Sequence, residues 1–330
     1  MPDSPSESGL SAVLLPAAVE PVSSAQKAAL GTFNKGLTAA VLGYCIWGLF
    51  PLYFKLLKSV PALEVLAHRV VWSFLLLLVI VSYKGMLAGF FKALRTPASL
   101  ASLSLSTVLI TLNWGLFIYA VEIGQTKSAS LGYYINPFVN VALGMFFLGE
   151  RLAVLQKIAL GFAAFGVGWL VMHQNEIPWI SLALAFSFGF YGLVRKKSAV
   201  KPLLGLTVET ALMTPLALIY AITLASAGNL AFGAVGPMET SLLLCAGLLT
   251  TVPLLLFTFG AQTIPYSMMG FIQFITPTLH LVCALAVFGE TITHHELISF
   301  ILIWVGLGFF VAQLFVSTRK LPNKKSLQKR

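Results

Sequence analysis

The sequence carries little charge. Only 10% of its 330 residues are Asp, Glu, Lys or Arg, whereas 58% are hydrophobic. Soluble globular domains have roughly 25% charged residues, so this balance excludes an ordinary water-soluble globule. A helix needs about 20 apolar residues to cross the hydrocarbon layer, and ten crossings would therefore use about 200 residues. The remainder suffices for two tails and short connections, but for no sizeable soluble domain.

Residues that carry out chemistry in membrane-embedded enzymes are also scarce. Asp3 is the only aspartate, and His294-His295 with Glu296 has no further metal ligand nearby in the sequence. No GxxxxGK[ST] phosphate-binding loop occurs, which argues against ATP-driven pumping. The three cysteines lie in apolar runs without CxxC spacing and predict neither a disulfide framework nor a metal site. We therefore expect no enzymatic activity, no metal and no cofactor.

Apolar runs of membrane length recur along most of the chain, separated by short loops that contain charge, Pro or Gly. We predict ten membrane-spanning helices near residues 36–54, 63–83, 99–121, 128–148, 152–172, 178–194, 203–226, 239–261, 267–289 and 296–316. Residues 1–33 have acids where a signal peptide would have basic residues, and they predict a disordered cytoplasmic tail. Residues 317–330 predict a basic cytoplasmic tail.

The distribution of basic residues predicts the orientation in the membrane. With the N-terminus in the cytoplasm, 17 of the 21 Lys and Arg residues fall in cytoplasmic segments. Only Lys55, Lys58 and Lys127 fall outside, and Arg69 lies within a helix. This asymmetry follows the positive-inside rule. It places both termini of a multi-pass protein in the cytoplasm and accounts for the net charge of +10 without a nucleic-acid partner.

The two halves of the chain repeat each other. A shift of 140 residues superposes the run 132–148 on the run 272–288, including Pro137 on Pro277 and the Gly-Glu pair that follows each run. Chance similarity between two Leu- and Phe-rich stretches is the alternative, but it seldom aligns Pro and Gly-Glu together. A shift of 141 also pairs Trp47 with Phe188.

The repeat predicts the fold class. Its two halves, 34–173 and 174–316, each hold five predicted helices, and an odd number of crossings inverts the second half relative to the first. We therefore predict an all-α membrane protein with ten transmembrane helices in two inverted five-helix repeats. This architecture is typical of secondary transporters, which bind substrate near the midplane between the halves.

Two prolines suggest where the substrate pathway lies. Pro137 and Pro277 fall near the middle of their predicted helices, and each frees the carbonyl four residues earlier. Unpaired backbone groups at that depth are tolerated where they line a cavity, although a purely structural kink is the alternative. We predict that both prolines line the pathway together with polar neighbours on the same helices, namely Tyr133, Tyr134, Asn136, Gln273 and Thr276.

Ionisable side chains within the predicted helices include His68, Arg69, Glu209 and His280. Such residues are costly in a membrane and suggest function. The repeat relates Arg69 to Glu209, but roughly 12 Å of depth between them disfavours a direct salt bridge. One hypothesis has Arg69 attract an anionic group of the substrate while Glu209 exchanges a proton; the alternative is that both side chains snorkel to the interfaces. His280 is a second candidate for proton coupling, with a local hydrogen bond as the alternative.

Two further motifs lie near the predicted pathway. Asn113 and Trp114 lie well inside the third helix, where an amide beside an indole can bind a ring-bearing substrate. The alternative is that Asn113 joins helices through hydrogen bonds. Gly149-Glu150 predicts a tight turn, with the carboxylate at the N-terminus of the helix that follows.

Several blocks of this sequence resemble the RarD proteins, bacterial members of the EamA group in the drug/metabolite transporter superfamily. They are HRVVWS (68–73), NW (113–114) with Phe117, SLGYYINP (130–137), LGER (148–151), AFSFGFYGLVRKK (185–197), TTVP (250–253), GF (270–271) and PT (277–278). The resemblance covers about residues 35–316. It implies ten helices from two EamA repeats, a bacterial inner-membrane permease, and the historical description of a chloramphenicol-sensitivity protein.

The features together predict a secondary-active exporter of small amphipathic metabolites or drugs, such as amino acids or chloramphenicol-like compounds. Alternating access would come from rocking of the two halves, with proton coupling as a further hypothesis. The alternative is a flippase for a lipid or a lipid-linked intermediate. The expected partners are a small-molecule substrate and membrane lipids, and a homodimer is left open as the assembly.

Overall fold

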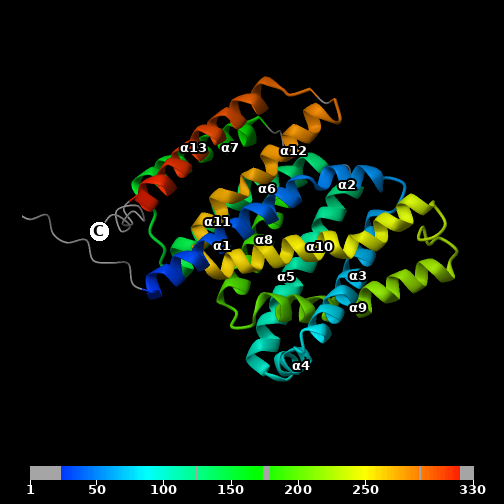
Figure 1. Ribbon diagram of the computed structural model, residues 1–330. Coiled ribbons are helices and arrows are strands. Elements are labelled where there is room, and N and C mark those ends of the chain that lie inside the picture. The colour runs from blue at the N-terminus through cyan, green and yellow to red at the C-terminus, as the bar shows by residue number, and fades with distance from the viewer. Residues whose placement is uncertain (1–23, 124, 174–178, 290, 320–330) are drawn as a thin grey trace, which may run out of the picture.

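The computed structural model describes residues 24–123, 125–173, 179–289 and 291–319, and these residues form helices and no strand (Figure 1). The helices are α1 (Ser24–Gly48), α2 (Phe50–Leu56), α3 (Ala62–Tyr83), α4 (Leu87–Arg95), α5 (Pro97–Glu122), α6 (Thr126–Leu148), α7 (Val154–Met172), α8 (Trp179–Lys197), α9 (Pro202–Ser226), α10 (Pro237–Thr263), α11 (Tyr266–Gln273), α12 (Ile275–Ala286) and α13 (His294–Arg319). The predicted all-helical class is confirmed.

Nine segments of the described chain are long and apolar enough to cross a membrane. In two of them a pair of helices shares one crossing, α1 with α2 and α11 with α12. The helix α8 supplies a tenth crossing, packed against α5 and α6, and its last turn is basic. The ten predicted helices therefore correspond to ten crossings of the structure.

Two boundaries differ from the prediction. The helix α1 begins at Ser24, so the last part of the predicted N-terminal tail is helical, and residues 1–23 and 320–330 lie outside the described residues. The helix α4 lies where we predicted a loop. It is short and amphipathic, with Phe90 and Ala93 buried and Lys92 and Arg95 exposed, and a segment of that length gives no membrane-length apolar run.

The proline positions have unequal effects on the two related helices. Pro137 lies inside α6, which continues through it as one helix. Pro277 follows a break at Phe274, which separates α11 from α12. Proline cannot donate to the carbonyl four residues earlier, so the break lies in the turn that this missing bond weakens.

Helix contacts show the inverted repeat directly. The counterparts in the two halves are α1 and α8, α3 and α9, α5 and α10, α6 and α11 with α12, and α7 and α13. The helix α1 packs on α10, and α8 packs in the same way on α5. Three further contacts join counterparts to each other: α3 with α9, α6 with α11, and α7 with α13. The two halves are thus related by a pseudo-twofold relation.

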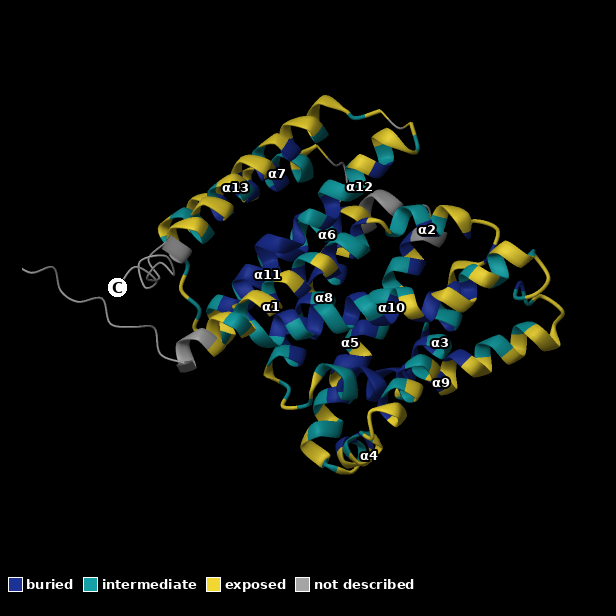
Figure 2. Cartoon of the chain, in the orientation of Figure 1, coloured by how far each residue is buried: buried dark blue, intermediate teal, exposed yellow. Residues whose placement is uncertain are grey.

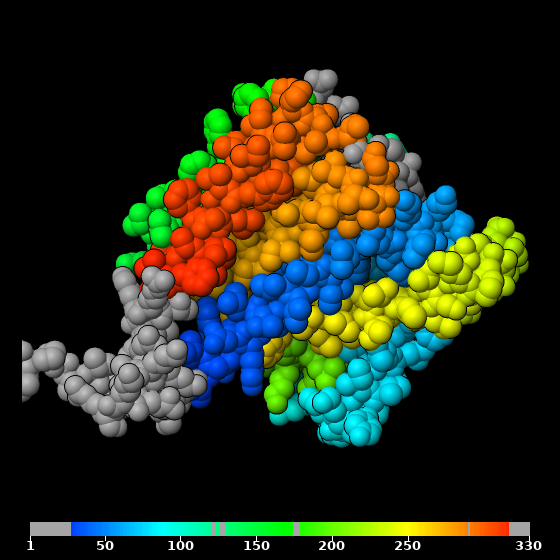
Figure 3. Space-filling view, turned by 45° about the horizontal axis from the view of Figure 1, so that its top comes forward, coloured from blue at the N-terminus to red at the C-terminus, as the bar shows by residue number. Residues whose placement is uncertain are grey.

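Burial follows this arrangement. Buried residues gather on α8, α10 and α11 in the middle of the bundle, and exposed residues dominate the outward faces of α13 and α9 (Figure 2). On one face, α12, α1 and α10 lie side by side (Figure 3). Below, the terminal end is the end of the bundle where α1 begins and α13 ends, and the distal end is the opposite one.

Candidate functional site

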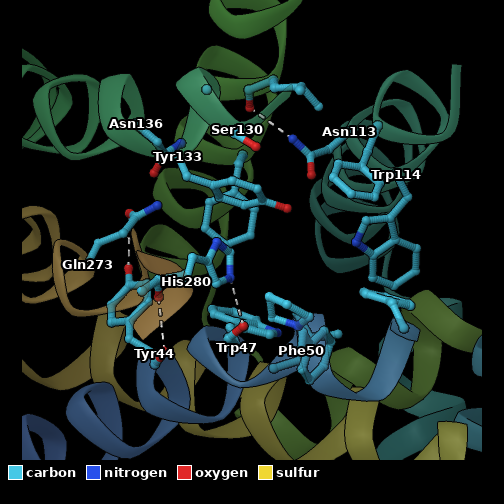
Figure 4. A pocket seen from close by; sticks show the side chains of 18 of the residues that line it. Tyr44, Trp47, Phe50, Asn113, Trp114, Ser130, Tyr133, Asn136, Gln273 and His280 are labelled. Carbon is cyan, nitrogen blue, oxygen red and sulfur yellow. Dashed lines mark hydrogen bonds between the residues drawn. The ribbon is translucent and has the colours of Figure 1, made fainter. Parts of the chain in front are cut away.

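A cavity of about 290 Å³ lies between the two halves (Figure 4). Its wall comes from α1, α2, α3, α5 and α6 of the first half and from α8, α10, α11 and α12 of the second. The lining residues are Tyr44, Trp47, Phe50, Pro51, Phe54, Arg69, Asn113, Trp114, Phe117, Ser130, Gly132, Tyr133, Asn136, Leu184, Phe188, Leu254, Gln273, Thr276 and His280. Eight of these 19 residues are Phe, Trp or Tyr, and most of the others have polar side chains. Apolar ring surfaces combined with polar groups are typical of small-molecule sites.

Arg69 lies in this wall, about two turns from the distal end of α3. Its Nε donates to Thr250 Oγ1 at 2.9 Å, which fixes the guanidinium against α10 of the other half. The guanidinium carbon lies 4.9 Å from the ring centre of Trp114, and the rings of Phe50 and Phe54 lie at 5.7 and 5.9 Å. Stacking on aromatic faces is a favourable environment for a guanidinium.

The polar groups of the wall are held by bonds between helices. Asn113 Nδ2 donates to Leu184 O at 2.8 Å and to Ser187 Oγ at 3.0 Å, both on α8. Asn136 Nδ2 donates to Ala185 O at 2.7 Å, also on α8. Asn113 therefore makes the interhelical bonds of the structural alternative and lines the cavity as well.

His280 lies in the wall and bonds across the interface between the halves. Its Nε2 lies 3.2 Å from Trp47 O, and since a carbonyl can only accept, Nε2 carries the hydrogen. The ring of Tyr133 meets the His280 ring edge-on at 5.6 Å between centres (Figure 4). The local hydrogen bond that we considered as an alternative is thus present.

A hydrogen-bond network closes the cavity toward the terminal end. Asn140 Nδ2 donates to Gln273 Oε1 at 2.7 Å, and Tyr44 OH donates to the same oxygen at 3.3 Å. Tyr266 OH lies 2.9 Å from Asn140 Oδ1 and 2.7 Å from Gly189 O. Three of these contacts join the first half to the second, and the contact of Tyr266 with Gly189 joins α11 to α8 within the second half. The network therefore closes the space between the halves on this side.

Glu150 strengthens the same closure. Its carboxylate accepts from Tyr266 N at 2.6 Å and from Ser267 N at 2.7 Å, at the N-terminus of α11. Our prediction that Glu150 caps the helix that follows it was wrong. The helix α7 starts only at Val154, and the side chain of Gln156 caps it by accepting from Ala153 N. Glu150 therefore ties the end of α6 to α11 across the two halves.

Glu209 lies outside the cavity wall, in a buried ion pair. Its Oε1 lies 3.4 Å from Arg195 Nε, and neither side chain is more than 2% exposed. Ser106 Oγ donates to the same carboxylate, and Tyr191 OH lies 3.4 Å from Oε2. The snorkelling alternative was therefore wrong for Glu209, and Arg195, which we counted as a cytoplasmic loop charge, is instead buried at the end of α8.

The structure brings many of the predicted pathway residues together around one cavity. They are Arg69, Asn113, Trp114, Tyr133, Asn136, Gln273, Thr276 and His280. Tyr134, Pro137, Pro277 and Glu209 are not among the lining residues. Tyr134 packs its ring on Phe300 of α13, and the carbonyl of Pro137 faces Gly270 of α11.

The aromatic part of the wall was not predicted as a site. Tyr44, Trp47, Phe50, Phe54 and Phe188 line the cavity. One signal was present in the sequence, because the repeat pairs Trp47 with Phe188, and these two rings lie 5.7 Å apart in the structure. A repeat pair of aromatic residues can thus mark an interface between halves.

Comparison with known proteins settles the family. Residues 34–172 match the EamA-like transporter family. The chain is 43% identical over 288 residues to the protein RarD of Escherichia coli, covering 87% of this chain and 97% of that protein. The chain belongs to the RarD subfamily of EamA-like transporters. The predicted family resemblance and the two-repeat membrane fold are thereby confirmed.

Further relatives support membership of the same subfamily. The chain is 41% identical over 296 residues to an uncharacterized transporter of Pseudomonas aeruginosa, which covers 89% of this chain and 99% of that protein. A crystal structure aligns over 89% of this chain and 99% of its own with a TM-score of 0.64 at 17% identity, which shows the shared fold alone. With its apolar helices, the chain is a multi-pass inner-membrane transporter.

Proposed function

We propose that this protein is a secondary-active transporter that moves small amphipathic solutes by alternating access between its two halves. The observation that carries the proposal is the cavity between the halves, lined from both and closed toward the terminal end by bonds between them. If the contacts at the terminal end broke and the two halves came together at the distal end, the same cavity wall would be exposed to the opposite face of the membrane. The cytoplasmic location of both termini, proposed from the charge distribution, makes the present state closed toward the cytoplasm.

Pseudo-symmetry supports this mechanism. Ile272 is the repeat counterpart of Gly132, which lines the cavity. Ile272 itself is buried at 4% exposure on the closed side. Exchanging the conformations of the two halves would bring Ile272 into the position that Gly132 occupies now.

Thiol labelling tests alternating access without knowledge of the substrate. In a background with Cys45, Cys245 and Cys283 replaced, we expect Ser130→Cys, in the wall, to react with an impermeant reagent from the distal face. Ile272→Cys is expected to react only from the terminal face. Conditions that raise the labelling rate of Ser130→Cys are expected to lower that of Ile272→Cys. Labelling of both positions from one face, or of neither under any condition, would contradict alternating access.

Glu209 remains the proposed proton-coupling residue. Its ion pair with Arg195 joins α9 to α8. Protonation of the Glu209 carboxylate would remove its negative charge and so break this ion pair. His280 remains the second candidate, because it is a titratable wall residue bonded across the halves.

An imposed pH gradient tests the coupling. In inverted membrane vesicles, we expect gradient-dependent accumulation of a solute with the native protein and none in empty vesicles. Glu209→Gln is expected to abolish the accumulation at equal protein content, because the amide cannot exchange a proton. If the Glu209→Gln variant still accumulates the solute, the protein is a transporter whose proton coupling does not depend on Glu209. The same comparison with His280→Gln tests the second candidate.

A further inference from the structure

The charges of the cavity wall are unequal. Arg69 is the one Lys, Arg, Asp or Glu among the described residues that line it, and the other polar side chains there are amides, hydroxyls, indoles and the His280 imidazole. No carboxylate of the described side chains forms an ion pair with Arg69, whose Nε donates to the neutral Thr250 hydroxyl. Among the described residues, the wall therefore carries a fixed positive charge and no fixed negative charge.

Arg195, at the end of α8, shows the contrast. Arg195 is paired with Glu209 at 3.4 Å, so that pair is neutral overall. An unpaired charge is costly away from water, and at Arg195 the carboxylate of Glu209 offsets that cost. The described groups in contact with Arg69 are aromatic rings and a hydroxyl. A guanidinium has five N–H donors, and the bond from Nε to Thr250 uses one of them.

The remainder of the wall defines what surrounds an anion bound there. Trp114 flanks the guanidinium, while Trp47, Phe117 and Phe188 offer ring faces and edges within the same cavity. These surfaces are suited to a ring or a short hydrocarbon chain. The volume of 290 Å³ lies at the lower end of the range for small-molecule sites, which limits the ligand to the size of a small metabolite.

We propose that the cavity binds an organic monoanion, with a carboxylate on the guanidinium of Arg69 and an apolar ring or chain against the aromatic wall. This inference rests on the proposed transport function and names its substrate class. An ammonium group is disfavoured because no described residue of the wall supplies a carboxylate to receive it. The cavity therefore selects against amino-acid zwitterions and organic cations of the same size.

A ligand series with one common ring tests the charge selectivity. The probes are 3-phenylpropanoate, phenylalanine, 3-phenylpropanol and 2-phenylethylamine, which are an anion, a zwitterion, a neutral alcohol and a cation. Binding is measured as the rise in unfolding midpoint with ligand concentration, using the protein in neutral phosphatidylcholine nanodiscs. We expect the anion to bind roughly tenfold to hundredfold tighter than the other three, as for a charged hydrogen-bonded contact.

Three variants connect the selectivity to Arg69. Arg69→Gln is expected to remove the preference for the anion, whereas Arg69→Lys retains part of it because the charge remains. Lys58→Gln removes an exposed positive charge outside the cavity wall and is expected to leave the preference unchanged. A comparable loss in Lys58→Gln would mean that the net charge of the protein, and not Arg69, favours the anion.

Other outcomes overturn the proposal. Binding of phenylalanine or 2-phenylethylamine at least as tightly as the anion would contradict a monoanion site, and so would no binding by any probe. An Arg69-dependent rise in midpoint with phosphatidylglycerol alone would assign the anion to a lipid headgroup. The labelling of Ser130→Cys and Ile272→Cys tests alternating access separately. A negative result for the monoanion proposal would therefore leave the proposed transport function standing.

Discussion

Arg195→Met is expected to lower the free energy of unfolding by about 3–5 kcal/mol, because it leaves the Glu209 carboxylate buried without its cation. Arg195 is fully buried and Glu209 is 1% exposed, so water cannot replace the lost partner without rearrangement. The measurement is reversible unfolding in mixed micelles, with the native protein as reference.

The double variant Arg195→Met with Glu209→Gln is the control for this prediction. Removing both charges of a buried pair is often nearly neutral, whereas removing one is not. We therefore expect the double variant to recover most of the lost stability, with Tyr191 and Ser106 still able to bond the amide. Equal losses in the single and double variants would show that the packing of the Arg195 side chain, and not the charge pair, stabilises this region.

Glu150→Gln is expected to open the terminal side of the cavity. The Glu150 carboxylate accepts two backbone hydrogens at the N-terminus of α11, and such charged bonds contribute about 1.5–3 kcal/mol each. An amide has one acceptor oxygen and no charge. We expect Ile272→Cys to be labelled roughly tenfold faster from the terminal face in the Glu150→Gln background.

Glu239→Gln is a matched control for Glu150→Gln. Glu239 is also a carboxylate near a helix N-terminus, in the first turn of α10, but it lies at the distal end. The same chemical change there is expected to leave the labelling rate of Ile272→Cys unchanged. If both variants accelerate labelling equally, a general loss of stability and not release of the terminal closure would explain the result.

The helices could be predicted from the sequence because hydropathy is a local property. The inverted repeat followed because each half holds an odd number of predicted crossings. The aligned prolines, Pro137 and Pro277, and the Gly-Glu pairs fixed the register of the two halves. The contacts between counterpart helices then follow from the inverted relation. What this pattern did not reveal is that Pro277 follows a break while Pro137 lies in a continuous helix.

The closure could not be predicted because its partners are far apart in the sequence. Asn140 and Gln273 are 133 residues apart, and Glu150 is 116 residues from Tyr266. Arg195 was assigned to a loop because it precedes Lys196 and Lys197. A buried arginine cannot be told from its exposed neighbours in such a basic run. Glu64, in the first turn of α3, is likewise fully buried and accepts from the backbone of Ala231 and Phe232, which are more than 160 residues away in the sequence.

The different environments of the two arginines have a kinetic consequence. The pseudo-twofold relation makes the architecture of the two access routes equivalent, but it relates Arg69 to Glu209 and so does not make their charges equivalent. The proposed anion would meet, on the distal side, an arginine that no described carboxylate pairs with, whereas Arg195 toward the terminal end is buried and already neutralised by Glu209. Anion entry and exit would therefore have unequal rates at the two faces, while the solute gradient and any coupled ion alone set the direction of net flux.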